Sequence, residues 1–166
     1  MKKKIVCFIV LFIGIVSIMP AQTDQFFLDL NGVIMFYPGF ETNIGWSRFV
    51  FNDRLGFIGN ARYIGTFASI PNDEEFVTKA IHNIGLMAGG VFNILGYDKI
   101  FRPNLYAKIG CGYYISNSSY FRLLWAVGLN LDVYLSDAFA FSAGAGLDTD
   151  FFKFSLGMKL SKTIRR

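Results

Sequence analysis

Few residues in this 166-residue sequence have the chemistry for catalysis or metal binding. His82 is the sole histidine and the only general base of the usual type for acyl transfer, yet no serine lies within two residues of it. The sequence contains no G-x-S-x-G segment and no Cys/His cluster of the kind that holds zinc. We therefore expect no enzymatic activity, no catalytic residues, no cofactor and no bound metal.

Cysteine and clustered acids have simpler interpretations. Cys111 falls on the apolar side of an alternating segment, where a free cysteine behaves as a small hydrophobe. The acidic run at 73–75 has the chemistry to contact a divalent cation, but we expect a solvated loop instead. The segment GLMAGG at 85–90 lacks the Lys-Ser/Thr ending of a phosphate-binding loop.

The remaining candidates are single charges at alternate positions of otherwise apolar segments. On a strand, such positions share one face. Charges of both signs can pair inside a narrow interior, so we expect a buried network; an ion path lined by Lys and Arg is the alternative. The network would consist of Asp29, Arg62, Lys108, Arg122, Asp132, Asp148, Lys153 and Lys159.

The clearest element that would position such charges is the segment 121–135. Every second residue in FRLLWAVGLNLDVYL is large and apolar, beginning at Phe121 and ending at Leu135. A strand turns successive side chains to opposite faces, so one face is apolar and the other carries mostly small or polar residues. The segment is long for an ordinary strand and suits a tilted strand that crosses a bilayer, which needs about 9–11 residues.

Similar alternation predicts eight strands, at 26–37, 43–52, 56–68, 78–95, 104–116, 121–135, 138–148 and 151–161. Short connections with turn chemistry, such as Ser136-Asp137, predict an up-and-down meander. Longer loops are expected at 38–44, 69–77 and 96–103. The fold class is therefore all-β.

The first 21 residues have the layout of a secretory signal peptide. Lysines at 2–4 precede an almost wholly apolar run at 5–18, and Ala21 ends the segment before polar residues begin. We expect cleavage after Ala21, leaving a barrel domain at 22–166; a retained inner-membrane anchor is the alternative. Removing those three lysines from the 16 Lys and Arg leaves 13 basic residues against 12 acidic ones. The mature chain therefore has no charge signature for nucleic acid.

The composition points to a membrane barrel. The chain is 53% hydrophobic with 19 Phe, 8 Tyr and 2 Trp, more than a mature soluble chain of this size can readily bury. An open sheet cannot sit in lipid because its edge amides would lack partners, so the strands must close, and eight is the smallest usual number. Aromatic residues near strand ends would form interfacial girdles: Phe26, Phe27, Phe36, Tyr37, Tyr113, Tyr114, Tyr120, Phe121, Phe151 and Phe152.

The export signal, the eight alternating segments and the closing segment FFKFSLGMKL resemble the small outer-membrane β-barrel proteins of the OmpA/OmpX-like superfamily. The resemblance implies periplasmic termini and outward loops at 38–44, 69–77, 116–119 and 148–150. That side would then be acidic, through Glu41, Asp73, Glu74, Glu75, Asp148 and Asp150. One departure is that the last strand of that group commonly ends on an aromatic residue, whereas here either the strand stops near Leu160 or the insertion signal differs.

The sequence thus predicts a small, non-enzymatic integral protein of the bacterial outer membrane with a structural or surface-interaction role. Its expected partners are outer-membrane lipid, the assembly machinery during insertion and a surface ligand that the sequence does not identify. Two alternatives stay open: a narrow pore for small solutes, and a secreted soluble barrel that binds a hydrophobic ligand inside.

Overall fold

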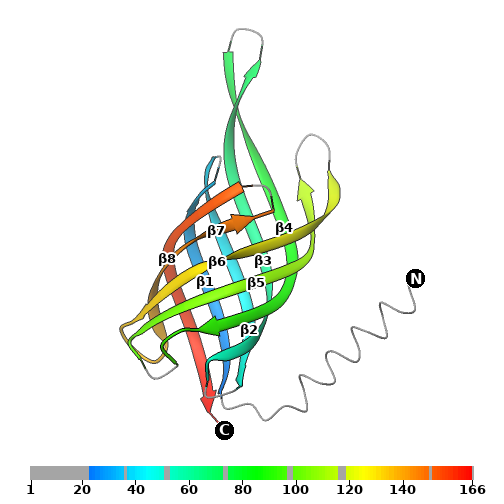
Figure 1. Ribbon diagram of the computed structural model, residues 1–166. Coiled ribbons are helices and arrows are strands. Elements are labelled where there is room, and N and C mark those ends of the chain that lie inside the picture. Colours follow the sequence, from blue (N-terminus) through cyan, green and yellow to red (C-terminus); the bar gives the residue numbers. More distant parts are fainter. Residues whose placement is uncertain are drawn as a thin grey trace, which may run out of the picture.

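The chain forms a closed antiparallel barrel of eight strands (Figure 1). The computed structural model describes residues 23–35, 37–50, 53–72, 75–96, 99–115, 119–149 and 151–165. Each strand pairs with its neighbours in chain order, and β1 pairs with β8 to close the sheet. The strands are β1 (Thr23–Ile34), β2 (Pro38–Val50), β3 (Leu55–Asn72), β4 (Glu75–Asn93), β5 (Phe101–Ile115), β6 (Tyr120–Tyr134), β7 (Phe139–Asp148) and β8 (Phe151–Arg165). The predicted eight-stranded up-and-down barrel is confirmed.

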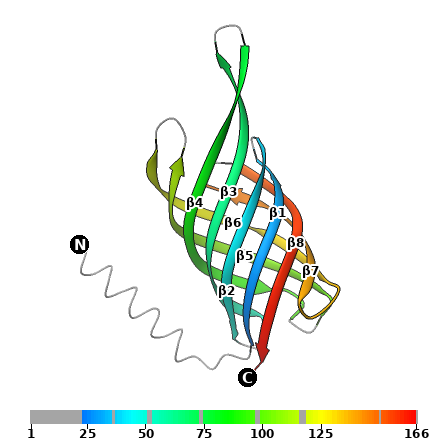
Figure 2. The same cartoon turned by 180° about the vertical axis from the view of Figure 1, so that it is seen from behind.

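The two ends of the barrel differ (Figures 1 and 2). At the end that we call lower, Thr23 of β1 pairs with Arg165 of β8. At the upper end the β3–β4 hairpin projects beyond the other strands, as both views show. The register agrees, because β3 pairs with β2 only as far as Thr66 and β4 pairs with β5 only from His82.

Several predicted boundaries were wrong. The expected loop at 38–44 is strand, since β2 begins at Pro38, and most of the expected loop at 69–77 belongs to the β3–β4 hairpin. The final strand does not stop near Leu160 but continues to Arg165. These stretches lie at the barrel ends, where the contrast between an apolar and a polar face weakens and alternation no longer marks a strand.

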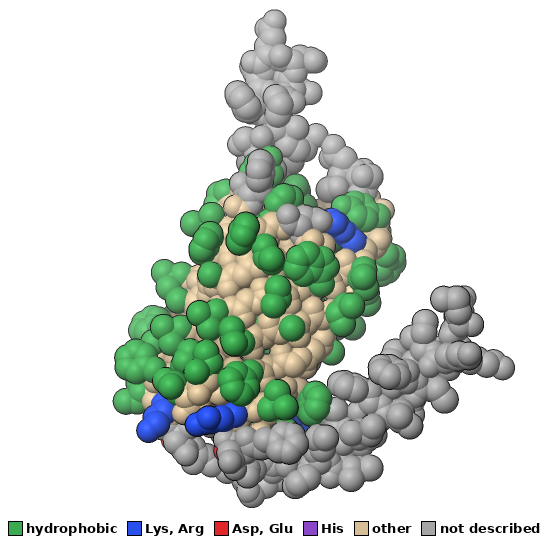
Figure 3. All heavy atoms as spheres, viewed as in Figure 1, with side chains coloured by type: hydrophobic (Ala, Val, Ile, Leu, Met, Phe, Trp, Pro, Cys, Tyr) green, Lys and Arg blue, Asp and Glu red, His purple; other side chains and the backbone are tan. Residues whose placement is uncertain are grey.

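The outer face of the barrel is apolar. On β6 the odd-numbered residues Phe121, Leu123, Trp125, Val127, Leu129 and Leu131 are exposed, whereas Leu124, Ala126 and Asp132 are buried. Phe121 is 79% exposed, and Phe152 and Leu156 on β8 are each 70% exposed. Figure 3 shows hydrophobic side chains spread over the barrel wall, with Lys and Arg near its lower edge and near its upper end. A contiguous apolar surface of this extent marks contact with lipid or another apolar partner.

This arrangement is the reverse of a soluble barrel that holds a hydrophobic ligand. In such a barrel Trp125 and Leu129 would line the interior and Asp132 would face water. Here both apolar side chains are exposed, and Asp132 is only 2% exposed. The soluble-barrel alternative is therefore inconsistent with the structure.

The predicted aromatic girdles are only half right. Two adjacent residues of a strand cannot both face outward, because successive residues point to opposite faces. This applies to the pairs Phe26-Phe27, Tyr113-Tyr114 and Phe151-Phe152. Phe26, Tyr113, Phe121 and Phe152 do lie on the outer face, whereas Phe27 is buried. Tyr37, Tyr114, Tyr120 and Phe151 line a cavity at the upper end of the lumen, where Tyr120 and Phe151 remain partly exposed. Phe36 lies outside the described residues.

An apolar layer fills one side of the lumen. Leu124 is fully buried and packs with Met87, Ala126, Tyr106 and Tyr114. Gly85 and Gly112 make room for it: a Cβ atom added at either position would lie 2.5 or 2.6 Å from Leu124 Cδ1. Close packing of this kind is expected of an eight-stranded barrel, whose interior is just wide enough for side chains to fill.

The chain segment proposed as a signal peptide, residues 1–21, lies outside the described residues. In the part of the chain that is described, no helix is long and apolar enough to cross a membrane.

Candidate functional site in the barrel lumen

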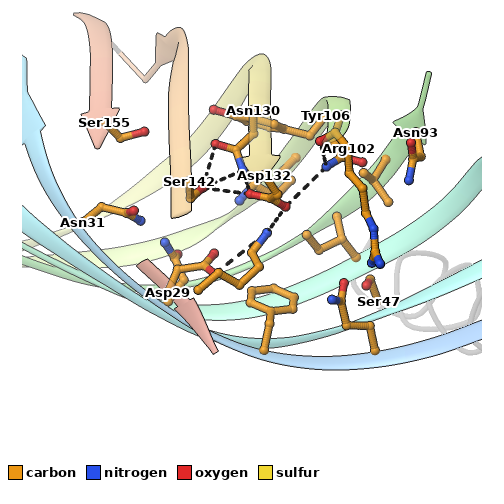
Figure 4. A pocket seen from close by; sticks show the side chains of 18 of the residues that line it. Asp29, Asn31, Ser47, Asn93, Arg102, Tyr106, Asn130, Asp132, Ser142 and Ser155 are labelled. Atoms are coloured by element: carbon orange, nitrogen blue, oxygen red, sulfur yellow. Dashed lines mark hydrogen bonds and ion pairs between the residues drawn. The ribbon is translucent and has the colours of Figure 1, made fainter. Parts of the chain in front are cut away.

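A cluster of polar residues lies in the lower half of the lumen. This lower cluster consists of Asp29 on β1, Asn130 and Asp132 on β6, Ser142 on β7 and Lys159 on β8. Asp132 Oδ1 accepts hydrogen bonds from Asn130 Nδ2 at 2.7 Å and Ser142 Oγ at 2.8 Å (Figure 4). Its Oδ2 accepts one from Lys159 Nζ, which lies 3.9 Å from Asp29 Oδ1. A buried carboxylate needs such partners to remain charged.

A second cluster lies higher in the lumen. This upper cluster consists of Glu41 on β2, Arg62 on β3, Asp148 on β7 and Lys153 on β8. Lys153 Nζ lies 2.9 Å from Glu41 Oε2 and 3.3 Å from Asp148 Oδ2, and Arg62 Nη1 donates to that same Asp148 oxygen. Since β3 and β7 are four strands apart in the closed ring, the Arg62–Asp148 pair spans the full width of the lumen.

Lys108 joins the upper cluster through amides. Its Nζ lies 3.3 Å from Asn60 Oδ1 and stands 5.0 Å from the centroid of the Tyr106 ring. Asn60 Nδ2 in turn donates to Asn43 Oδ1 at 2.7 Å, and Asn43 Nδ2 donates to Glu41 Oε1 at 3.0 Å. One series of polar contacts therefore links five strands. It runs from Lys108 on β5 through the amides on β3 and β2 to Lys153 on β8, Asp148 on β7 and finally Arg62 on β3.

The structure thus divides the eight charges expected inside. Asp29, Asp132 and Lys159 belong to the lower cluster, and Arg62, Asp148 and Lys153 to the upper cluster, which Lys108 reaches through Asn60. Arg122 lines a cavity above the upper cluster. None of these positions is in a loop, because all eight lie within strands.

Sequence reasoning misplaced Glu41 and assigned Asp148 to two incompatible sites. The resemblance put both on an acidic outer surface, but Glu41 is 3% and Asp148 is 2% exposed, and both are paired inside the barrel. The misplacement of Glu41 followed from starting its strand at 43 instead of at Pro38. Glu41 and Asn43 are two residues apart and so share a face of the strand. This spacing could have indicated that Glu41 points into the lumen together with Asn43. The side chains of Asp73, Glu74, Glu75 and Asp150 lie outside the described part.

Two cavities lie on either side of the upper cluster. The upper cavity has a volume of about 350 Å³ and is lined by Arg62 and Asp148, among others. The lower cavity has a volume of about 90 Å³ and is lined by Glu41 and Lys153 together with the lower cluster. The two cavities share no lining residue. The ion pairs of Asp148 with Lys153 and Arg62 lie between the two cavities. The apolar layer around Leu124 lies between them as well, since it packs against Tyr106 of the lower cavity and Tyr114 of the upper cavity.

The residues with catalytic chemistry are not assembled into a site. His82 lies on the outward-facing side of β4, where its Nδ1 is 2.6 Å from Tyr63 Oη. Cys111 is exposed on the apolar face of β5 between Ile109 and Tyr113. Within the described ranges, no group of three or more His, Cys, Asp or Glu residues could hold a metal ion.

Comparison with solved structures identifies similar barrels. The N-terminal β-barrel domain of OprF from Pseudomonas aeruginosa is 16% identical, with a TM-score of 0.53, over 86% of this chain and 98% of that one. Neisserial surface protein A (NspA) is 12% identical, with a TM-score of 0.51, over 84% and 94%. The outer membrane protein Ail of Yersinia pestis, in a phospholipid bilayer nanodisc, is 18% identical, with a TM-score of 0.50, over 85% and 99%.

No protein-family model matches the chain, and no curated protein matches it in sequence. The likeness therefore rests on structure, and at these identities it establishes the fold. That fold is a closed eight-stranded antiparallel barrel, as in the N-terminal domain of OprF and in NspA.

Proposed function

We propose that the protein is a small integral barrel of the bacterial outer membrane, without enzymatic activity, that stabilises the envelope or presents its upper end to a surface ligand. The observation that carries the proposal is the division between the two faces. Exposed Phe, Leu, Ile and Trp side chains cover the outside, whereas paired charges fill the inside. Lipid stabilises such an outer face, and a polar interior is typical of barrels in that membrane.

The alternative of a narrow pore receives less support from the lumen. A conducting path needs a continuous series of sites from which ions can leave again. Here the two cavities share no lining residue, and the lumenal cations of the upper cluster are held by Glu41 and Asp148. We therefore propose that the lumen is closed in the resting state.

The remaining partners follow from the same proposal. Export through the segment at 1–21 would deliver the chain to the periplasm, and the outer-membrane assembly machinery would close β1 against β8 during insertion. The lower end, where β1 begins and β8 ends, would then face the periplasm, and the β3–β4 hairpin would face outward.

Fractionation of a Gram-negative host that expresses the full chain tests this function. We expect the protein in the outer-membrane fraction, resistant to alkaline carbonate, and we expect faster gel migration when the detergent extract is left unboiled, as for a closed barrel. Recovery of the folded protein in the aqueous fraction without detergent would contradict the proposal.

A further inference from the structure

The upper cavity has the size and the walls of a small-molecule site. Its volume of about 350 Å³ lies within the usual range for ligand pockets, about 300–1,000 Å³. Its apolar lining includes Ile64, Ile81 and Phe151. The rings of Tyr114 and Tyr120 stack with an interplanar angle of 5° and a centroid separation of 5.4 Å, which gives one wall a parallel aromatic pair.

Two nitrogen donors of side chains that line this cavity have no acceptor. Arg62 Nη2 donates to Asn83 Oδ1 at 3.3 Å. Because a guanidinium can only donate, this contact fixes the amide oxygen of Asn83 toward Arg62 and leaves its Nδ2 on the other side. Neither Asn83 Nδ2 nor Arg62 Nε has a hydrogen-bond partner within the described part of the protein. A buried donor without an acceptor is destabilising, so the site is incomplete as it stands.

The charge around the cavity also favours an anion. Among the described residues, Arg62, Arg122 and Asp148 are the charged groups that line it. The Asp148 carboxylate already contacts both Arg62 and Lys153, so its charge is offset from the side of the lower cavity as well. The described lining is thus positive on balance.

We propose that the upper cavity binds a small organic carboxylate with a flat aromatic body. Its carboxylate oxygens would accept hydrogen bonds from Asn83 Nδ2 and Arg62 Nε, and its ring would lie against Tyr114 and Tyr120. Both side chains line the cavity, but the two nitrogen atoms themselves have almost no accessible surface, so the guanidinium and the amide must turn toward the cavity to make these contacts. The proposal does not depend on membrane location or on a closed lumen.

Titration of the detergent-solubilised, isotope-labelled protein with 2-naphthoate tests the proposal, with backbone amide shifts as the readout. We expect saturable shifts at Asn83, Tyr114 and Tyr120 and none at Asp132 in the lower cluster. The neutral analogue 2-naphthamide and the flexible carboxylate octanoate should each bind on the order of tenfold more weakly. The amide lacks the negative charge, and octanoate lacks a ring that could stack. Micelles without protein provide the reference for partitioning into detergent.

Two variants and a matched control locate the site. Asn83→Asp replaces the orphaned donor by an anionic oxygen and should weaken 2-naphthoate binding on the order of tenfold. Tyr114→Leu removes one stacked ring and should also weaken binding, whereas Tyr113→Leu changes the neighbouring side chain on the outer face of the same strand and should have no effect. Heat-modifiable migration checks that each variant is folded.

Absence of saturable shifts at Asn83 and Tyr114 in the wild-type protein would overturn the proposal. Equal binding of 2-naphthamide or octanoate would overturn the assigned chemistry. Unchanged binding by folded Asn83→Asp and Tyr114→Leu variants would place the ligand elsewhere and would equally overturn it.

Discussion

Asp148 forms ion pairs with two cations of the upper cluster, whereas Glu41, the other acid of that cluster, pairs with Lys153. Both Arg62 and Lys153 contact its Oδ2 atom, and all three side chains are almost wholly buried. Removal of one member of a buried ion pair leaves an uncompensated charge, which is costlier than the loss of the attraction itself. The position is therefore a sensitive point of the barrel despite its place at the end of β7.

We expect Asp148→Ala to lower the free energy of unfolding by about 3–5 kcal/mol, since it leaves the Arg62 and Lys153 charges without their shared acceptor. Urea titration in detergent micelles, with the folded fraction read from gel mobility, measures the change. The control is Asp137→Ala in the exposed turn between β6 and β7, for which we expect a change within about 0.5 kcal/mol. Equal unfolding midpoints for the two variants would contradict the assigned role of Asp148.

At the scale of the element, β6 has one face for lipid and one for the lumen. Leu129 lies near the middle of the strand on the exposed face, and Leu135 lies just beyond its lower end. The cost of a charge on the lipid face of a barrel falls steeply with distance from the bilayer midplane. The same substitution at these two positions therefore compares two depths in the bilayer while the introduced residue stays the same.

We predict that Leu129→Arg destabilises the protein in phospholipid vesicles by about 2–4 kcal/mol and Leu135→Arg by about 0–1 kcal/mol. Reversible urea unfolding, followed by tryptophan fluorescence, gives both values. If the two substitutions cost the same, or if Leu135→Arg costs more, then the outer face of β6 does not span the apolar layer as proposed.

The elements also show what sequence could predict. Alternation on β6 and β8 placed Trp125, Leu129 and Lys159 on the correct faces, because lipid on one side and a narrow lumen on the other impose opposite requirements. That constraint is lost where β3 and β4 extend beyond their other neighbours, so the extent of the β3–β4 hairpin was missed. The sequence could not predict which charges form ion pairs. Arg62 and Asp148 are 86 residues apart in the sequence, and only closure of the sheet brings them together.

For the whole molecule, closure of the sheet determines both what faces lipid and what blocks the lumen. The pair formed by Arg62 and Asp148 joins opposite walls, and Lys153 and Glu41 extend the partition on the side of the lower cavity. Removal of both Arg62 and Asp148 avoids the unpaired buried charge that either single variant would leave, and Lys153 keeps Glu41 as its acceptor. The double variant Arg62→Ala with Asp148→Ala should therefore fold and connect the two cavities.

Single-channel recording in planar bilayers tests the central claim, which is a membrane barrel whose lumen is closed by buried ion pairs. We predict no discrete conductance steps for the wild-type protein and reproducible steps for the Arg62→Ala, Asp148→Ala double variant at the same protein density, with heat-modifiable migration as the check on folding. Discrete steps from the wild-type protein, at a frequency equal to that of the double variant, would contradict the claim.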